Sequence, residues 1–137
     1  HVYYTYGRLL TMAQAYCYEG RLYHDEELLN DIVAGLDFMY EYAFNENTSR
    51  IGNFWEWHMG TPDYYARIVS LLYDVLPQRV KTNYFNTIVA QLRNFVERGN
   101  YTYGNQATAC VRLLYCGVLC NSAEDIDIAL RSLVRAL

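Results

Sequence analysis

The sequence predicts an all-α fold, in which antiparallel helical hairpins form part of an incomplete (α/α) toroid. Three observations favour this architecture. Apolar residues recur at three- and four-residue spacing along most of the chain, and no segment alternates in the manner of a strand. The helical segments are joined by short turns, which is typical of antiparallel neighbours. Their lengths are similar and their apolar faces are wide, which fits a layered or toroidal array better than a slim four-helix bundle.

Two helices and a loop are predicted in the first third of the chain. The first helix covers about residues 3–17 and is broken by Gly20. The second covers 25–44, where Asp25 is a suitable N-cap and apolar residues follow at helical spacing. Residues 45–52 are polar and rich in turn formers, so we expect a loop there.

Two further helices are predicted in the middle of the chain. Thr61 followed by Pro62 is a cap with proline at the first helical position, which is a strong signal for a helix start. Pro77 ends that helix. The next runs from about residue 81 to 98, and Gly99 supplies the glycine that commonly follows a helix.

The last third contains two more predicted helices. Residues 100–104 form a short aromatic loop, and 106–120 are helical again. Ser122 and Asp125 resemble a capping box for a final helix. That helix reaches Leu137 without a stop signal, and the first begins equally abruptly. We therefore expect residues 1–137 to form a single helical domain cut from a longer helical chain.

Composition excludes several classes of protein. The chain is 53% hydrophobic and 19% charged, which excludes a disordered segment, and its apolar runs are too short for a membrane span. The net charge is −4 and no basic block occurs, which argues against nucleic acid and mildly against any polyanion as a ligand. Tyrosine is frequent, with 15 residues, and its ring suits both helix packing and sugar binding.

The cysteines indicate no metal site. Cys116 and Cys120 would share a helix face, which could be half of a metal site, but no histidine or second close pair accompanies them. We expect buried free thiols, with one disulfide of Cys17 left open if the protein is secreted. No cofactor is predicted. The remaining cysteine and the histidines are Cys110, His1, His24 and His58.

The segment NFWEWHMGTP, residues 53–62, has the residue types of a functional site. It places aromatic rings beside a carboxylate and a histidine, and it leads from a polar loop into the helix predicted at Thr61. Trp55 and Trp57 would project to opposite sides if the segment were extended, so one could pack inward while the other faced a ligand. Residue types alone leave a core and a ligand platform equally open.

The same segment resembles the Asn-Trp-Trp-(Asp/Glu)-Trp-x-x-Gly-x-Pro motif of polysaccharide lyase family eight, which includes hyaluronate, chondroitin AC and xanthan lyases. Residues 8–16 and 27–45, with the turn at 36–40, are similar to the two helices before that motif in the family. Residues 102–119 resemble its Thr-Gly-Ala-Asn segment and the glycine that follows twelve residues later. Asn105 and Gly117 keep that spacing.

This resemblance implies that the chain is part of a lyase that cleaves uronate-containing acidic polysaccharides by β-elimination. Asn105 would be its catalytic asparagine, whose amide neutralises the uronate carboxylate so that the C5 proton becomes more acidic. Gly104 would permit a sharp turn at the helix entry, and a helix N-terminus favours anions. The partners implied are an acidic polysaccharide and the rest of the parent chain, with no nucleic acid and no membrane. The location implied is secreted or extracellular.

The resemblance also implies a substrate-binding patch of Asn53, Phe54 and Trp55, extended by Trp57. Phe54 stands where the family usually has tryptophan. Tyr101 and Tyr103 flank the asparagine that the resemblance makes catalytic. They would either add to the aromatic platform or simply pack against neighbouring helices, and both interpretations stay equally open.

His58 stands where the family often has glutamate, and we expect a partly exposed histidine near a helix start with no catalytic role. Residues 106–108 also depart from the Arg-x-Asp that commonly follows the asparagine.

The chain alone is predicted to be inactive, because the family's proton-transferring histidine and tyrosine and its assisting arginine lie downstream of the asparagine. After Cys120 the only cationic residues are Arg131 and Arg135, and neither histidine nor tyrosine occurs. Three hypotheses remain open. The chain is part of a glycan lyase, a non-catalytic helical module that binds glycans, or a purely structural helical array in which 53–62 is buried.

Overall fold

The chain is entirely helical, and the predicted all-α class is confirmed. The computed structural model describes residues 1–137, without strands. The helices follow in the order α1 (Val2–Cys17), α2 (Glu26–Tyr42), η1 (Glu56–Gly60), α3 (Thr61–Leu71), α4 (Gln78–Ile88), η2 (Val89–Arg93), α5 (Asn94–Arg98), α6 (Tyr103–Leu119) and α7 (Ala123–Ala136). The two η segments are short π-helical stretches. None of the helices is long and apolar enough to cross a bilayer.

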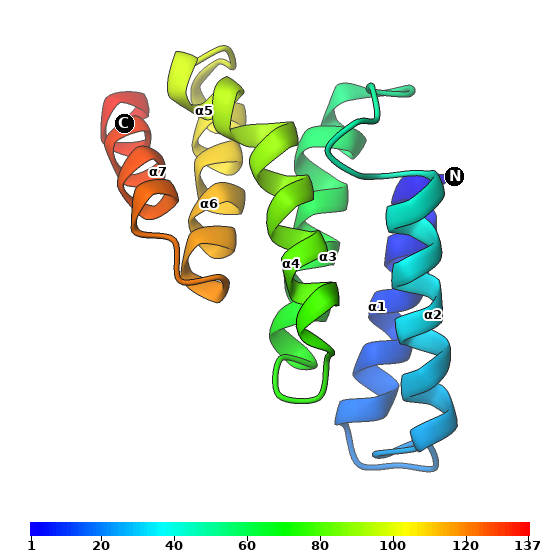
Figure 1. Cartoon of the computed structure of the whole chain (residues 1–137). Coiled ribbons are helices and arrows are strands. Elements are labelled where there is room, and N and C mark those ends of the chain that lie inside the picture. Colours follow the sequence, from blue (N-terminus) through cyan, green and yellow to red (C-terminus); the bar gives the residue numbers. More distant parts are fainter.

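The helices stand side by side as successive antiparallel hairpins (Figure 1). The row runs from α1 and α2 through α3 and α4 to α6 and α7. The α1–α2, α3–α4 and α6–α7 turns lie at one end of the array, at the bottom of the view. The α2–α3 loop and the α5–α6 loop lie at the other end. The segments that carry the two sequence motifs are therefore brought to the same end of the array.

Three of the predicted helix boundaries are confirmed by their capping bonds. The Asp25 carboxylate accepts a hydrogen bond from the Leu28 amide at 2.8 Å. Gly99 ends α5 in the left-handed conformation, with φ of 68°. Ser122 Oγ accepts from the Asp125 amide at 3.4 Å at the start of α7. These local signals decide where the chain turns.

The α3 helix begins at Thr61 as predicted, but the prediction that Thr61 caps a new helical segment is wrong. The helical segment already begins at Phe54, and Thr61 lies in mid-helix with φ of −62° and a hydroxyl that has no partner. The cap is Asn53, whose Oδ1 accepts from the backbone amides of Trp55 at 2.7 Å and Glu56 at 3.3 Å. A cap-like residue pair can also lie inside a longer helical segment. A sequence pattern does not show which of two nearby cap residues begins that segment.

The expectation for Gly104 is also wrong. The residue with positive φ at the entry to α6 is Tyr103, at 37°, and Gly104 lies inside the helix without a positive φ. The α6 helix begins at Tyr103 rather than at residue 106, and α4 begins at Gln78 rather than near 81.

The core consists of two clusters. The larger is built mainly from α1 to α4, with Trp57 of η1, Leu92 of η2 and Cys116 of α6, and three tyrosines on α1, α3 and α4 lie fully inside it. The smaller joins Met59 of η1 to α5, α6 and α7. The π-helical segment η1 therefore contributes to both clusters and ties the two halves of the array together. All four cysteines are unpaired in the structure.

Candidate functional site

A cleft of about 590 Å³ opens where the α2–α3 and α5–α6 loops meet, and we call it the aromatic cleft. The rings of Phe54, Phe95 and Tyr101 line it, together with the polar side chains of Arg50, His58 and Gln91. The remaining lining residues are Thr48, Ser49 and Asn100, so no acidic side chain lines it. The cleft therefore combines an apolar wall with a polar rim.

The aromatic wall is a row of rings centred on Tyr101. The Phe54 and Tyr101 rings stack with centroids 6.0 Å apart at 20°, and those of Phe95 and Tyr101 lie 5.8 Å apart at 29°. The His58 ring completes the row at 4.7 Å from Phe95. These residues come from the start of the helical segment at Phe54, from η1, from α5 and from the α5–α6 loop, so the wall exists only in the folded chain. A flat apolar surface of this kind suits the C–H face of a sugar ring.

His58 is buried, with 5% of its surface exposed, and the expectation of a partly exposed histidine is wrong. Its Nδ1 lies 2.7 Å from the Tyr101 hydroxyl. Burial lowers the pKa of His58 to about 4, and the nearby positive charge of Arg50 acts in the same direction. Burial raises the pKa of Tyr101 to about 12, opposed by Arg50. Both groups are therefore neutral near pH 7.

Gln91 of η2 ties the α2–α3 loop to the helices. Its Nε2 donates to the carbonyl oxygens of Asn45 and Thr48, each at 2.8 Å, and its Oε1 accepts from Nε1 of Trp57 at 2.9 Å. Trp57 itself is 2% exposed and packs in the core. The indole that the sequence assigned to the substrate patch thus helps to position the loop, and we leave it out of the surface that faces a ligand.

The predicted patch residues take separate places. Asn53 caps the helix, as described above, and Phe54 lines the cleft. Trp55 is 42% exposed but does not line the aromatic cleft. Its ring packs edge-on against Tyr3 of α1, with centroids 6.1 Å apart. The two tryptophans do project to different surroundings, because residues two apart on a helix point to nearly opposite sides.

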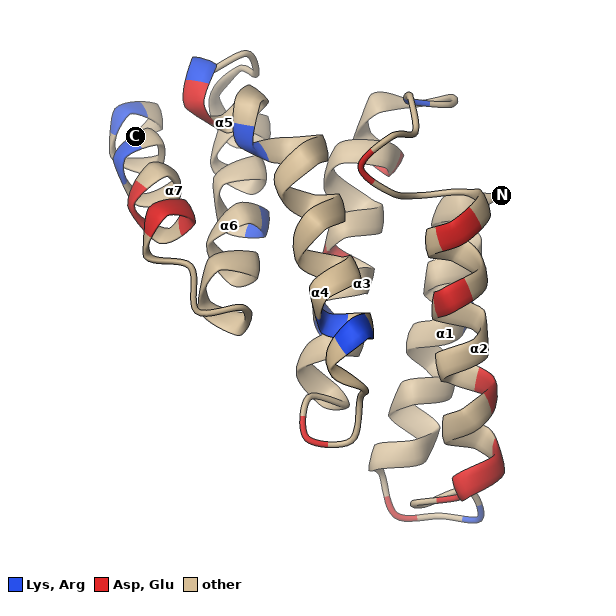
Figure 2. Ribbon diagram, viewed as in Figure 1, with Lys and Arg blue, Asp and Glu red and all other residues tan.

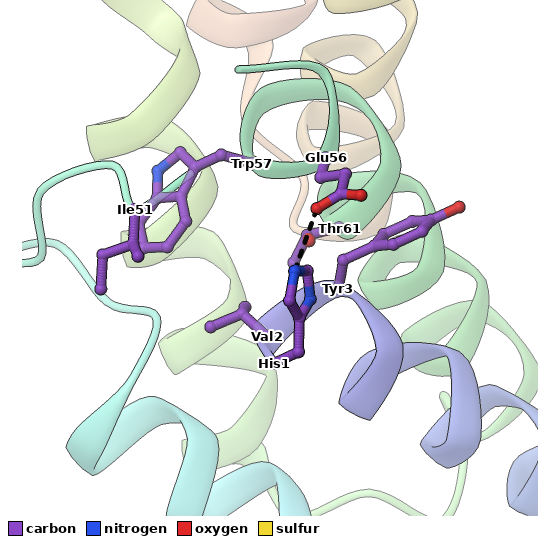
Figure 3. Close-up of a pocket in the computed structure, with 7 residues that line it drawn as sticks. All are labelled: His1, Val2, Tyr3, Ile51, Glu56, Trp57 and Thr61. Atoms are coloured by element: carbon purple, nitrogen blue, oxygen red, sulfur yellow. Dashed lines mark ion pairs between the residues drawn. The ribbon is translucent and has the colours of Figure 1, made fainter. Parts of the chain in front are cut away.

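Trp57 lines a second, smaller pocket of about 230 Å³, drawn in Figure 3. Trp57 and Tyr3 line it on opposite sides, and the His1 imidazole forms an ion pair with Glu56, with Nε2 and Oε2 3.3 Å apart. The segment at 54–60 thus has the aromatic cleft on one side and this pocket on another.

The residues around the predicted catalytic asparagine are only partly brought together. Tyr101 lies in the cleft, whereas Tyr103 is 86% exposed and outside it. Asn105 lies partly buried in the first turn of α6, one turn beyond Tyr101, and is not among the residues that line the cleft. Its backbone amide donates to the Thr102 carbonyl at 3.0 Å. Gln106 fixes the loop by accepting from the Tyr101 amide at 3.0 Å.

Sequence reasoning missed the roles of Arg50 and Gln91. Gln91 carried a usable signal, because it is a polar residue in an otherwise apolar stretch between Ile88 and Leu92. A polar side chain at such a position is expected to satisfy buried backbone groups. Arg50 carried no signal, since an arginine in a polar loop is typical of any surface. No group of three or more His, Cys, Asp or Glu side chains is placed to hold a metal ion.

Comparison with known proteins yields one family throughout. The model of the N-terminal alpha-helical domain of polysaccharide lyase family 8 matches residues 1–137. A xanthan lyase of Bacillus sp. strain GL1 is 38% identical over 85 residues, which cover 61% of this chain and 9% of that protein. The hyaluronate lyase HylB of Enterococcus faecalis is 28% identical over 151 residues, covering 94% of this chain and 15% of that protein.

Solved structures agree with the sequence matches. Chondroitin AC lyase of Streptomyces coelicolor A3, in complex with chondroitin sulphate, matches 98% of this chain with a TM-score of 0.91 and 30% identity. Xanthan lyase of Paenibacillus matches the same share with a TM-score of 0.89 and 27% identity. The chain spans 19% and 13% of those two structures, and thus less than a fifth of any of these relatives.

Proposed function

Because the chain belongs to polysaccharide lyase family 8 and matches its N-terminal α-helical domain, we propose that it forms part of a lyase that cleaves uronate-containing acidic polysaccharides by β-elimination. The family resemblance predicted from the motifs is confirmed by the match over residues 1–137. We also propose the class of substrate, the roles of individual residues and the activity of the whole protein.

The observation that supports it most is a cleft that joins the first motif segment to the residue just before the second. Phe54 belongs to the first segment and Tyr101 precedes the second, and their rings stack 6.0 Å apart. We propose that a sugar ring packs on these two rings with its C–H face. Each aromatic contact of this kind contributes about 1 kcal/mol to binding.

The chemistry proposed for Asn105 depends on its place in the first turn of α6. There its amide N–H groups can donate to a uronate carboxylate, and the positive end of the helix dipole adds to the effect. Neutralising the carboxylate stabilises the negative charge that develops when the C5 proton is removed. The C4–O bond then breaks, a C4–C5 double bond forms, and the departing oxygen takes up a proton.

The family resemblance implies a proton-transferring histidine and tyrosine downstream of the asparagine, and residues 121–137 contain neither. We therefore propose that the base that takes the C5 proton and the acid that protonates the leaving oxygen lie outside residues 1–137. On this view the chain supplies carboxylate neutralisation and sugar binding, and it has no lyase activity by itself. Because a long acidic polymer is found outside cells, we also propose an extracellular site of action.

The test is Asn105→Ala in the full-length protein. We expect the rate at which unsaturated uronate forms, followed by its ultraviolet absorbance, to fall by roughly 100-fold or more, as when an oxyanion-hole donor is removed. Glycan affinity should change less, because the proposed hydrogen bonds strengthen in the transition state. The matched control is Asn30→Ala, since Asn30 is exposed on α2.

Each outcome separates the hypotheses. Unchanged turnover in Asn105→Ala would overturn the proposed role of the amide. A wild-type protein that binds acidic glycans without forming unsaturated product would be a glycan-binding module. A protein that neither binds nor cleaves them would be a structural helical array.

A further inference from the structure

His58 has one ring nitrogen that the fold leaves free. Its Nδ1 lies within hydrogen-bond distance of the Tyr101 hydroxyl, and no hydrogen bond within the chain involves Nε2. The side chain is buried, yet Nε2 is not among the polar atoms that are sealed off without a partner. The imidazole lines the aromatic cleft, so the accessible nitrogen faces it. An accessible ring nitrogen that has no partner within the chain is available to hydrogen-bond a ligand in the cleft.

The hydrogen bond to Tyr101 decides what Nε2 offers. A phenol is a better donor than a neutral imidazole N–H, and an imidazole nitrogen is a better acceptor than a phenol oxygen, so we assign the shared proton to the Tyr101 hydroxyl. The lowered pKa of His58, caused by burial and by Arg50, keeps the ring neutral near pH 7. The single ring proton then resides on Nε2, which donates into the cleft.

Arg50 supplies the charge of the cleft. It is exposed, it is the only cationic residue among the lining residues, and it takes part in none of the ion pairs of the chain. It lines the same cleft as His58 and Tyr101, and its positive charge lowers the pKa of both groups. No acidic side chain lines the cleft to neutralise it.

We infer that Arg50 and the Nε2 proton of His58 form an anion-binding subsite in the aromatic cleft, which holds a carboxylate or sulfate ester of an acidic glycan. The inference rests on the proposed function and deepens it. Asn105 does not line this cleft, so the subsite binds a different acidic group from the one that Asn105 neutralises. It would select polymers in which a second anionic group lies next to the sugar stacked on Phe54 and Tyr101.

The test is a binding measurement with the full-length protein carrying Asn105→Ala, so that the glycan is not consumed. The probes are two tetrasaccharides with the same uronate spacing, one unsulfated of the hyaluronan type and one sulfated of the chondroitin type. Arg50→Gln should weaken binding by roughly three- to tenfold, as expected for loss of an exposed charge-assisted hydrogen bond. The matched control is Arg21→Gln, since Arg21 is also exposed and unpaired but lies in the α1–α2 turn at the other end of the array.

Two substitutions of His58 separate binding from packing. Gln can place its side-chain N–H near the position of Nε2, whereas Asn can occupy only the position of Nδ1. His58→Gln should therefore retain more affinity than His58→Asn. Thermal unfolding of both variants shows whether they fold, and Arg50→Gln gives the answer independently if they do not.

The outcomes are distinct from those for the proposed function. An equal loss with both tetrasaccharides identifies a carboxylate as the bound group, and a larger loss with the sulfated one identifies a sulfate ester. Binding that is as tight in Arg50→Gln as in Arg21→Gln would overturn the subsite while leaving the lyase proposal intact. If the Asn105→Ala protein binds neither tetrasaccharide, the subsite is overturned, whereas the lyase proposal is decided separately by the turnover of the wild-type protein.

Discussion

At the residue scale, Gly60 fixes how closely the aromatic side chains of the motif pack. A Cβ built on Gly60 would lie 2.5 Å from Cε1 of Tyr3 and 2.8 Å from Cζ3 of Trp55. Gly60→Ala should therefore displace both rings and destabilise the fold by about 1–3 kcal/mol, as overpacking does. Urea unfolding measures the loss, and tryptophan fluorescence reports the shift of Trp55.

Gly104→Ala is the matched control, because a Cβ there meets no atom within 4 Å and the residue lies in a helix. It should be neutral or stabilise by up to about 1 kcal/mol, through the better helix propensity of alanine. Equal destabilisation by the two alanines would contradict the packing argument.

His58 also predicts how stability depends on pH. Its pKa is lowered from 6.5 to about 4 in the folded state, first by burial and then by the charge of Arg50. Between these values the unfolded chain binds more protons, so the stabilisation is present above pH 6.5 and is lost as pH falls toward 4. From pH 7 to pH 5 the loss should be about 2 kcal/mol.

His58→Gln should flatten this part of the pH profile, measured by urea unfolding at each pH. The control is His24→Asn, at an exposed position with φ of 53°, which asparagine tolerates. A profile that His58→Gln leaves as steep as before would refute the assignment to His58.

At the scale of elements, a carboxylate–guanidinium pair joins η2 to α7. Asp125 is fully buried and binds Arg93 at two points, with Nε to Oδ1 at 2.6 Å and an Nη to Oδ2 at 2.9 Å. Ser122 Oγ donates to the same carboxylate at 2.6 Å. Asp125→Ala leaves the partly buried guanidinium with only the exposed Glu124 carboxylate, 3.7 Å away, and we expect a loss of about 3 kcal/mol in urea unfolding.

Asp127→Ala on the same helix provides the comparison. Asp127 pairs with Arg131 one turn away, and both side chains are largely exposed. An exposed pair of this kind contributes at most about 0.5 kcal/mol. Similar losses for the two aspartates would mean that burial of the Arg93 pair does not matter.

The start or end of a helix could be predicted where the local sequence signal is compatible with only one structure. The Asp25 cap, the left-handed Gly99 and the Ser122 capping box were all confirmed. Thr61-Pro62 has two readings, because proline also occurs inside a helix where the turn widens. In this structure the pair Thr61-Pro62 follows the π-helical η1, where the Thr61 amide donates a hydrogen bond to the carbonyl of Glu56, five residues earlier. Sequence patterns contain no signal for such a π-helical turn.

The kinds of residue at the candidate site could be predicted from the sequence, but most of the contacts between them could not. The motif at 53–62 correctly indicated an aromatic segment with one tryptophan inside and one partly exposed. The pairing of Phe54 with Tyr101 and of His58 with the same tyrosine joins residues more than forty positions apart. Only the antiparallel array brings them together, and helix periodicity does not specify which loops share an end.

At the scale of the whole molecule, the acidic charge is unevenly distributed (Figure 2). The α2 helix contains five acidic residues and no basic residue, whereas the whole chain has a net charge of −4. The rest of the chain is therefore slightly basic. The net negative charge is therefore concentrated on the N-terminal hairpin. The aromatic cleft lies between α2 and the C-terminal helices, so an acidic polymer bound there would be repelled less than the net charge of the chain suggests.

Two acids on α2 allow this to be tested on one helix. Glu41 lies near the end of α2 that leads into the loop of the aromatic cleft, and Glu26 lies at its start. Both are exposed, and fifteen residues of helix separate them by about 22 Å. At 0.15 M salt the Debye length is about 8 Å, so a charge at Glu26 is screened from the cleft far more than one at Glu41.

Glu41→Gln should therefore tighten binding of an acidic tetrasaccharide at low salt, whereas Glu26→Gln should have little effect. Coulomb's law in water gives roughly 0.3 kcal/mol for any two unit charges about 12 Å apart, which sets the scale of the effect at close to a twofold change in Kd. Titrations in full-length protein at low and at high salt measure it, and the gain in Glu41→Gln should vanish at high salt. Equal gains from the two glutamates would mean that the ligand senses only the net charge of the protein, and a gain from Glu26→Gln alone would move the binding site to the opposite end of the array.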